Sequence, residues 1–144
     1  DQTHVAYSMI DHDPWLGCEV AVVGGGDVAC ETALSLATLE GTAVTLLYRG
    51  EALNRPKPLN RERVRAAVDE GRLTLVLRAE ISRVTPTGLT VSTAGGPARN
   101  LIADQIFVCI GGTPPRAFLE SLGIELTTLR GESLRARRLT PQLA

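Results

Sequence analysis

A short glycine-rich loop, Gly24–Ala29 (Gly-Gly-Gly-Asp-Val-Ala), constrains the fold of this chain more than any other feature. It ends the β-branched apolar run Glu19–Gly24, which is typical of a strand buried on both faces. It opens the segment Asp27–Glu40, whose apolar residues recur at helical spacing until Gly41. A second apolar run, Ala43–Tyr48, completes a strand–helix–strand unit. Such a unit most simply forms two parallel strands joined by a right-handed crossover helix.

The remainder of the chain extends this unit. A second helix is predicted with Asn60 as its N-cap and Gly71 after its end, followed by a third strand over Leu73–Leu77. Three short alternating runs then lie between proline and glycine turns, at 81–85, 89–92 and 101–103. They predict an antiparallel meander where the next crossover helix would normally lie. A last buried strand is expected over Gln105–Ile110, and a short helix over Pro115–Leu122. The predicted fold class is α/β: a Rossmann-like parallel sheet with an antiparallel β-meander crossover.

The length of 144 residues suits one domain. Residues 1–18 are expected to form an arm or linker, 19–125 the domain, and 126–144 an Arg-rich, frayed tail. The net charge of −1 argues against nucleic-acid binding, and no apolar run reaches the roughly 20 residues of a membrane span. The cysteines are far apart and form no Cys-x-x-Cys pair, which argues against a metal site and an internal redox disulfide. They favour reduced, buried thiols in a cytoplasmic protein.

The glycine loop also satisfies the pattern G-x-G-x-x-[G/A] of dinucleotide-binding folds. In that reading Gly24 permits the tight turn, Gly26 lets the backbone approach a diphosphate, and Ala29 allows close packing of the helix. The N–H groups at the start of the helix would face the phosphates. The candidate cofactor-binding residues of the loop are Gly24, Gly25, Gly26, Asp27, Val28 and Ala29. The alternative is a strand-to-helix turn that binds nothing.

The second strand ends in Tyr48-Arg49, without the acidic residue that NAD-preferring sites place there for the ribose hydroxyls. A guanidinium cannot accept those hydrogen bonds, but it suits a 2′-phosphate. Arg49 therefore favours NADP(H) over NAD(H), and Arg55 is a further candidate phosphate contact. Residues 49–83 hold nine basic against five acidic residues, which would attract phosphate if they converge. The alternative is a solvated Arg-rich surface.

The segments Val20–Glu31 and Val44–Arg49 resemble the NAD(P)H-binding domain of thioredoxin-reductase-like flavoproteins, and of pyridine nucleotide–disulfide oxidoreductases more generally. Phe107–Gly112 and Pro115–Gly123 are similar to the last strand and following helix of that domain, so the resemblance covers about residues 17–125. It implies that Glu31 lies near the nicotinamide amide, although an acid near a helix N-terminus has a simpler explanation. It also implies that three residues where the last strand ends line the nucleotide: Ile110, Gly111 and Gly112.

Two departures from the family pattern bear on the cofactor. Arg49 matches the first arginine of the family's His-Arg-Arg phosphate motif, whereas Tyr48 replaces the histidine and Gly50 the second arginine. The resemblance therefore implies a preference for NADP(H), with Arg55 as a substitute donor.

The chain has neither a second glycine loop for FAD nor a redox cysteine pair. In the family that it resembles, the nicotinamide passes hydride to a flavin that a separate domain holds. We therefore expect a flavin-binding domain or subunit as partner, with FAD on that missing part, and no catalytic residue in this chain. The main alternative is a non-catalytic module that senses NAD(P)H or docks a partner. A self-sufficient dehydrogenase is less favoured, because little chain is left to build a substrate pocket with a proton donor.

Overall fold

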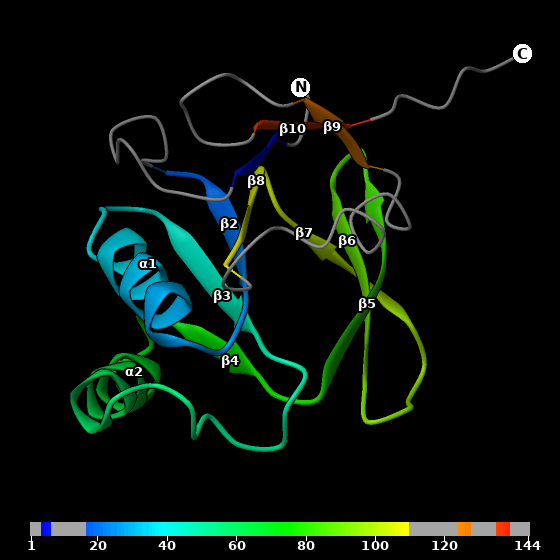
Figure 1. Cartoon of the computed structure of the whole chain (residues 1–144). Coiled ribbons are helices and arrows are strands. Elements are labelled where there is room, and N and C mark those ends of the chain that lie inside the picture. Colours follow the sequence, from blue (N-terminus) through cyan, green and yellow to red (C-terminus); the bar gives the residue numbers. More distant parts are fainter. Residues whose placement is uncertain (1–3, 7–16, 110–123, 128–134, 139–144) are drawn as a thin grey trace, which may run out of the picture.

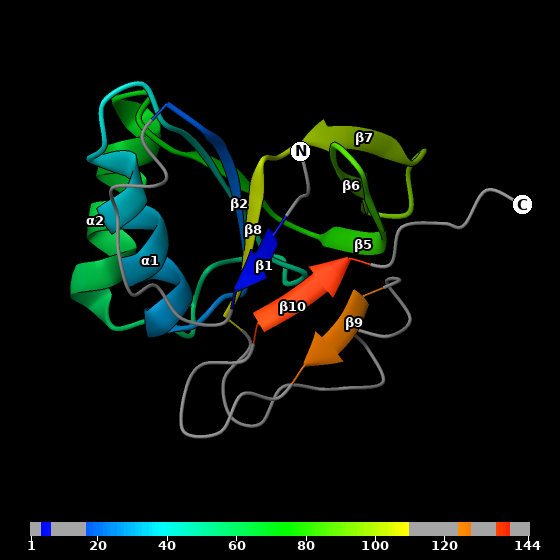
Figure 2. The ribbon, with the colours of Figure 1, turned by 90° about the horizontal axis from the view of Figure 1, so that it is seen from above.

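The computed structural model describes residues 4–6, 17–109, 124–127 and 135–138. The helices are α1 (Asp27–Ala37) and α2 (Pro58–Asp69). The strands of a large sheet are β1 (His4–Ala6), β2 (Glu19–Val23), β3 (Ala43–Leu47), β4 (Thr74–Val76), β8 (Gln105–Val108), β9 (Ile124–Thr127) and β10 (Arg135–Arg138). Those of a small sheet are β5 (Ala79–Thr85), β6 (Gly88–Thr93) and β7 (Arg99–Ile102). The two helices lie on one side of the large sheet and the small sheet on the other (Figures 1 and 2).

The large sheet has the order β4-β3-β2-β8-β1-β10-β9 (Figure 1). From β4 to β1 all neighbouring strands are parallel, and only β10 and β9 add antiparallel pairs. The chain reaches β8 from β4 through the antiparallel sheet β5-β6-β7, in the place of a crossover helix. The predicted fold class is therefore confirmed. Because β2, β3, β4 and β8 are parallel, their carboxyl ends meet at one edge, where ligands of open α/β sheets bind.

The alternating faces of the central strands build two separate cores. One core lies under the helices, where Leu36 and Val64 pack on Leu46 and Phe107. The other lies between the two sheets and contains the opposite face of the same strands together with buried residues of the meander. The meander therefore buries the face of the parallel sheet that a second helical layer would otherwise cover.

The second helix begins earlier than the sequence predicts, and Asn60 is not its N-cap. The helix starts at Pro58 with Lys57 as N-cap, because the fixed φ of a proline suits the first helical position. Asn60 lies in the first turn and is only 6% exposed, with its side chain toward α1. The first helix ends at Ala37, before the predicted Glu40. There the N–H and the hydroxyl of Thr38 both donate to the Ser35 carbonyl and tighten the last turn.

Strands also occur in the two segments that the sequence assigns to an arm and a tail. Strand β1 pairs in parallel with β8 and antiparallel with β10, and β10 pairs with β9. These strands have three or four residues each, too few for an alternating pattern to be recognised. The domain limits 19–125 stay a prediction, and the helix expected over 115–122 lies outside the described residues. No helix in the described part of the chain is long and apolar enough to cross a membrane.

Replacing Leu89 by alanine tests whether the meander is part of the same cooperative unit as the parallel sheet. Leu89 is 1% exposed and packs in the core that Leu47 and Ile106 of the large sheet share. We expect Leu89→Ala to lower the free energy of unfolding by about 2–5 kcal/mol in chemical denaturation, while unfolding stays a single transition. The control Arg83→Ala, at an exposed position of β5, should change it by at most about 0.5 kcal/mol. A separate early transition of the meander in Leu89→Ala would contradict a shared core.

Candidate functional site

The glycine loop lies where the carboxyl ends of three parallel strands meet. The Gly24 N–H donates to the carbonyl of Leu47 at the end of β3, with 3.0 Å between N and O. The Cys109 N–H, just after β8, donates to the carbonyl of Val23 at 2.8 Å. A Cβ on Gly24, whose φ is +147°, would overlap the Cys109 carbonyl oxygen and lie 3.0 Å from the Cβ of Ala29. The packing of the protein itself therefore requires a glycine at Gly24.

Gly26 differs, because no protein atom requires a glycine there. It is the N-cap of α1 with φ −97° and ψ −174°, an extended conformation open to any residue. Among the described residues, no heavy atom lies within 4 Å of a Cβ added to it. No side chain caps this helix end, and the first N–H groups of an α-helix have no acceptor inside the helix. The start of α1 therefore presents backbone donors and the positive end of the helix dipole to open space.

Tyr48 lies across the loop. A Cβ on Gly25 or on Gly50 would overlap its ring, with 2.8 and 2.7 Å to Cζ respectively, so the half-buried ring packs between two glycines. The backbone of Tyr48 is fixed by hydrogen bonds to Val76 and Ala79. The structure thus brings Tyr48 against the loop, while its apposition to a nucleotide stays a prediction.

Arg49 follows Tyr48 directly and is exposed. Arg55, in the loop before α2, is exposed as well. The ion pairs found in the described part of the chain join Arg72 to Glu70 and Arg78 to Glu51, so neither candidate arginine uses its charge in one of them. The structure shows no hydrogen bond or ion pair between Arg55 and the described residues of the glycine loop, so the role of Arg55 as a phosphate contact stays a prediction.

The starts of the two helices are joined through Asp27. Its Oδ1 accepts hydrogen bonds from the N–H of Lys57 and from Nδ2 of Asn60, both at 2.8 Å. These bonds, the one from Lys57 foremost, hold the pKa of Asp27 below its usual value. Since α2 has no side-chain cap of its own, the carboxylate of α1 caps it. Nδ2 of Asn60 also lies 3.2 Å from Oε1 of Glu31.

Glu31 therefore faces α2, and its predicted position near a nicotinamide is untested. Val28, another loop candidate, is 59% exposed. Ile110, Gly111 and Gly112 lie outside the described residues. Asn60 was not predicted to join this site, although a signal exists: it stands four residues before Val64, so a polar residue occupies the buried face of the helix.

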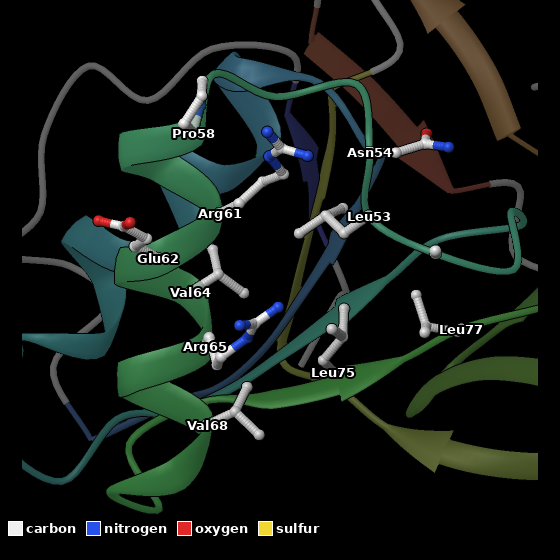
Figure 3. A pocket seen from close by; sticks show the side chains of 11 residues that line it. Leu53, Asn54, Pro58, Arg61, Glu62, Val64, Arg65, Val68, Leu75 and Leu77 are labelled. Carbon is white, nitrogen blue, oxygen red and sulfur yellow. The ribbon is translucent and has the colours of Figure 1, made fainter.

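An open groove of about 520 Å³ lies between α2, residues 52–54 and the strand β4 with the following Leu77 (Figure 3). Arg61 and Arg65 extend from α2 toward the groove, whereas Glu62 points away from it (Figure 3). The opposite wall is apolar and includes Leu53, Leu75 and Leu77. None of the glycine-loop residues lines this groove.

The two buried thiols, Cys30 and Cys109, lie in surroundings that disfavour the reactive thiolate. Burial, followed by the charges of Asp27 and Glu31, raises the pKa of Cys30 to about 11. Burial also raises the pKa of Cys109, against the weaker lowering effect of the Thr32 hydroxyl. In the described part of the chain, no group of His, Cys, Asp and Glu side chains could hold a metal ion. The cytoplasmic location inferred from the thiols stays a prediction.

The profile of the family described as pyridine nucleotide-disulphide oxidoreductase matches residues 8–134. The chain therefore belongs to the pyridine nucleotide-disulphide oxidoreductase family. This confirms the resemblance to the pyridine nucleotide–disulphide oxidoreductases, while the resemblance to their NAD(P)H-binding domain stays a prediction.

Three proteins illustrate the relationship. The glucosaminate ammonia-lyase of Pseudomonas fluorescens is 38% identical over 106 residues, which cover 70% of this chain and 32% of that protein. The ferredoxin–NADP reductase of Ignicoccus hospitalis is 31% identical over 132 residues, which cover 88% and 41% respectively. The solved structure of bacillithiol disulfide reductase from Bacillus cereus matches with a TM-score of 0.70 and 28% identity, over 90% of this chain and 40% of that one. The chain thus spans less than half the length of each.

The thiols provide a test of the packing around α1. At pH 8 only about one Cys30 in a thousand is ionised, and both Cys30 and Cys109 are buried. We expect a thiol-specific reagent such as dithionitrobenzoate to modify the half-buried Cys18 first, and the other two only after denaturation. Cys18→Ser should therefore remove the reaction of the folded protein. Rapid modification of this variant under native conditions would contradict the packing of α1 on the sheet.

Proposed function

We propose that this chain is the NAD(P)H-binding domain of a flavin-dependent oxidoreductase and presents the nicotinamide to a flavin held elsewhere. The observation that carries the proposal is Gly26, a glycine that neither its backbone conformation nor the packing of the described residues requires. It stands at an uncapped helix start, at the edge where parallel strands end. A ligand bound by the backbone at this point would explain why position 26 has no side chain. A diphosphate must approach the N–H groups closely, and a side chain would stand in its way.

The residues that we propose to contact the nucleotide are those of the sequence prediction: Gly24, Gly25, Gly26, Asp27, Val28, Ala29, Glu31, Tyr48, Arg49, Arg55, Ile110, Gly111 and Gly112. The end of β3 supports this assignment for the residues next to the adenosine ribose. The Gly24 N–H donates a hydrogen bond to Leu47, and the Tyr48 ring packs on Gly25. The exposed guanidinium of Arg49 favours the 2′-phosphate, hence NADP(H) over NAD(H). Neither backbone amides nor arginines supply acid–base chemistry, so the proposed role is binding and orientation.

The flavin, as FAD, and the final electron acceptor belong to a part of the protein outside this chain. The partial coverage of the relatives supports that division, because each of them is more than twice as long as the segment matched. One relative bears the name of an ammonia-lyase, so the reaction of the whole protein cannot be transferred from the family alone. A sensor without catalysis would use the same nucleotide site.

Substitutions at Gly24 and Gly26 distinguish an effect on nucleotide binding from an effect on the stability of the fold. Gly26→Ala places a methyl group where a diphosphate would approach, so we expect it to abolish measurable binding of NADPH and NADH in calorimetry. It should lower the free energy of unfolding by at most about 1 kcal/mol. Gly24→Ala should instead lower that free energy by about 1–3 kcal/mol or more, because its methyl group meets the Cys109 carbonyl. Unchanged NADPH binding by the folded Gly26→Ala protein would remove the loop from the site.

Arg49→Ala tests the cofactor preference. If the guanidinium holds the 2′-phosphate, NADPH binding should weaken by about 1.5–3 kcal/mol while NADH binding is barely affected, since NADH lacks that phosphate. The control Arg83→Ala changes the net charge equally, at an exposed position of the meander. Equal losses for both nucleotides in Arg49→Ala, or an NADPH loss as large in Arg83→Ala, would contradict a specific contact.

A further inference from the structure

The start of α1 carries two carboxylates next to the N–H groups that should bind an anion. Asp27 directly follows the N-cap Gly26, and Glu31 lies one turn later. A carboxylate in the first turn is itself attracted to the helix start, because the dipole is positive there. If Asp27 turned toward its own helix start, it would compete with a diphosphate and repel it. A carboxylate at position 27 therefore favours the proposed ligand only if it is held away from these N–H groups.

The structure shows where this charge goes instead. Oδ1 of Asp27 accepts both of its hydrogen bonds from α2, from the N–H of Lys57 and from Nδ2 of Asn60. The same amide nitrogen reaches Oε1 of Glu31. Asn60 is 6% exposed, so it is fixed in the contact between the helices. An amide suits this task, because its NH₂ group offers two donors and can serve both carboxylates at once.

We propose that Asn60 is a positioning residue for anion binding at the glycine loop. It holds the Asp27 carboxylate on the N-terminus of α2, which keeps this negative charge directed away from the N–H groups of α1. This inference rests on the proposed nucleotide binding. It assigns a role in affinity to a residue that touches no ligand and acts through the charge of Asp27.

The experiment is a double-mutant cycle on NADPH affinity, measured by calorimetry in the intact protein at constant low salt. Asn60→Leu keeps the volume and removes the donor, so the freed Asp27 should weaken NADPH binding by about 3- to 10-fold. In Asp27→Asn the repelling charge is absent, so NADPH should bind about 2-fold tighter or better than to the wild type. In Asp27→Asn/Asn60→Leu the affinity should return to within about 2-fold of Asp27→Asn alone. Asn60→Ser, too short to reach the carboxylates, takes the place of Asn60→Leu if the latter fails to fold.

A purely structural role for Asn60 would give a different pattern. The control Val64→Ala loosens the same helix one turn later without touching a carboxylate, and Asp27→Asn should not rescue its affinity. The loss caused by Asn60→Leu should also shrink as salt increases from 0.05 M toward about 0.5 M, since it is a repulsion between charges near the surface. If Asn60→Leu binds NADPH as the wild type does, or if Asp27→Asn fails to restore it, the inference is overturned while the proposed function stands. A wild-type protein that binds no NADPH overturns both.

Discussion

The convergence of three strand ends on Gly24 is the constraint from which the rest of the structure follows. The N–H of Gly24 donates to the carbonyl of Leu47 at the end of β3, and a Cβ on Gly24 would overlap the carbonyl oxygen of Cys109 after β8. No side chain fits between these strands, so the chain must leave β2 at this point and turn directly into α1. The open helix start, the ring of Tyr48 and the exposed Arg49 all take their positions from this crossing. A local backbone requirement thus determines the geometry where the glycine loop meets the end of β3.

Much of this fold can be predicted because its elements carry strong periodic signals. The runs around Val22, Leu46 and Phe107 are apolar without alternation, as strands covered on both faces must be. The glycine and proline turns between residues 85 and 100 separate short alternating segments, which distinguishes a meander from a helix. The glycine loop could be recognised from its position between a strand and a helix. Its individual glycines could not be ranked, because the distinction between Gly24 and Gly26 depends on Cys109, far away in the chain.

The parts that the sequence did not show depend on tertiary contacts between separated segments. Asn60 is a residue type that often serves as an N-cap, but the helix begins two residues earlier, at Pro58. The Asn60 amide lies within the first turn and donates to Asp27 of α1 instead. Tyr48 differs from the histidine of the related motif, and only the structure shows that its ring needs a glycine on either side. Strands β1 and β10 owe their conformation to pairing with an existing sheet rather than to a pattern of their own.

The position of β8 beside β2 determines when the surroundings of the glycine loop are completed during folding. Strands β2 and β3 are close in sequence and can pair early, but β8 is made only after the entire meander. Pairing between strands far apart in sequence is slow, because the loss of chain entropy on closing the loop comes before the contacts that compensate for it. During synthesis the glycine loop therefore lacks its contact with β8 until residue 109 has left the ribosome. A nascent chain with only the first strand–helix–strand unit would hold an incomplete loop. On the proposed function, a nucleotide would bind only after β8 has paired with β2.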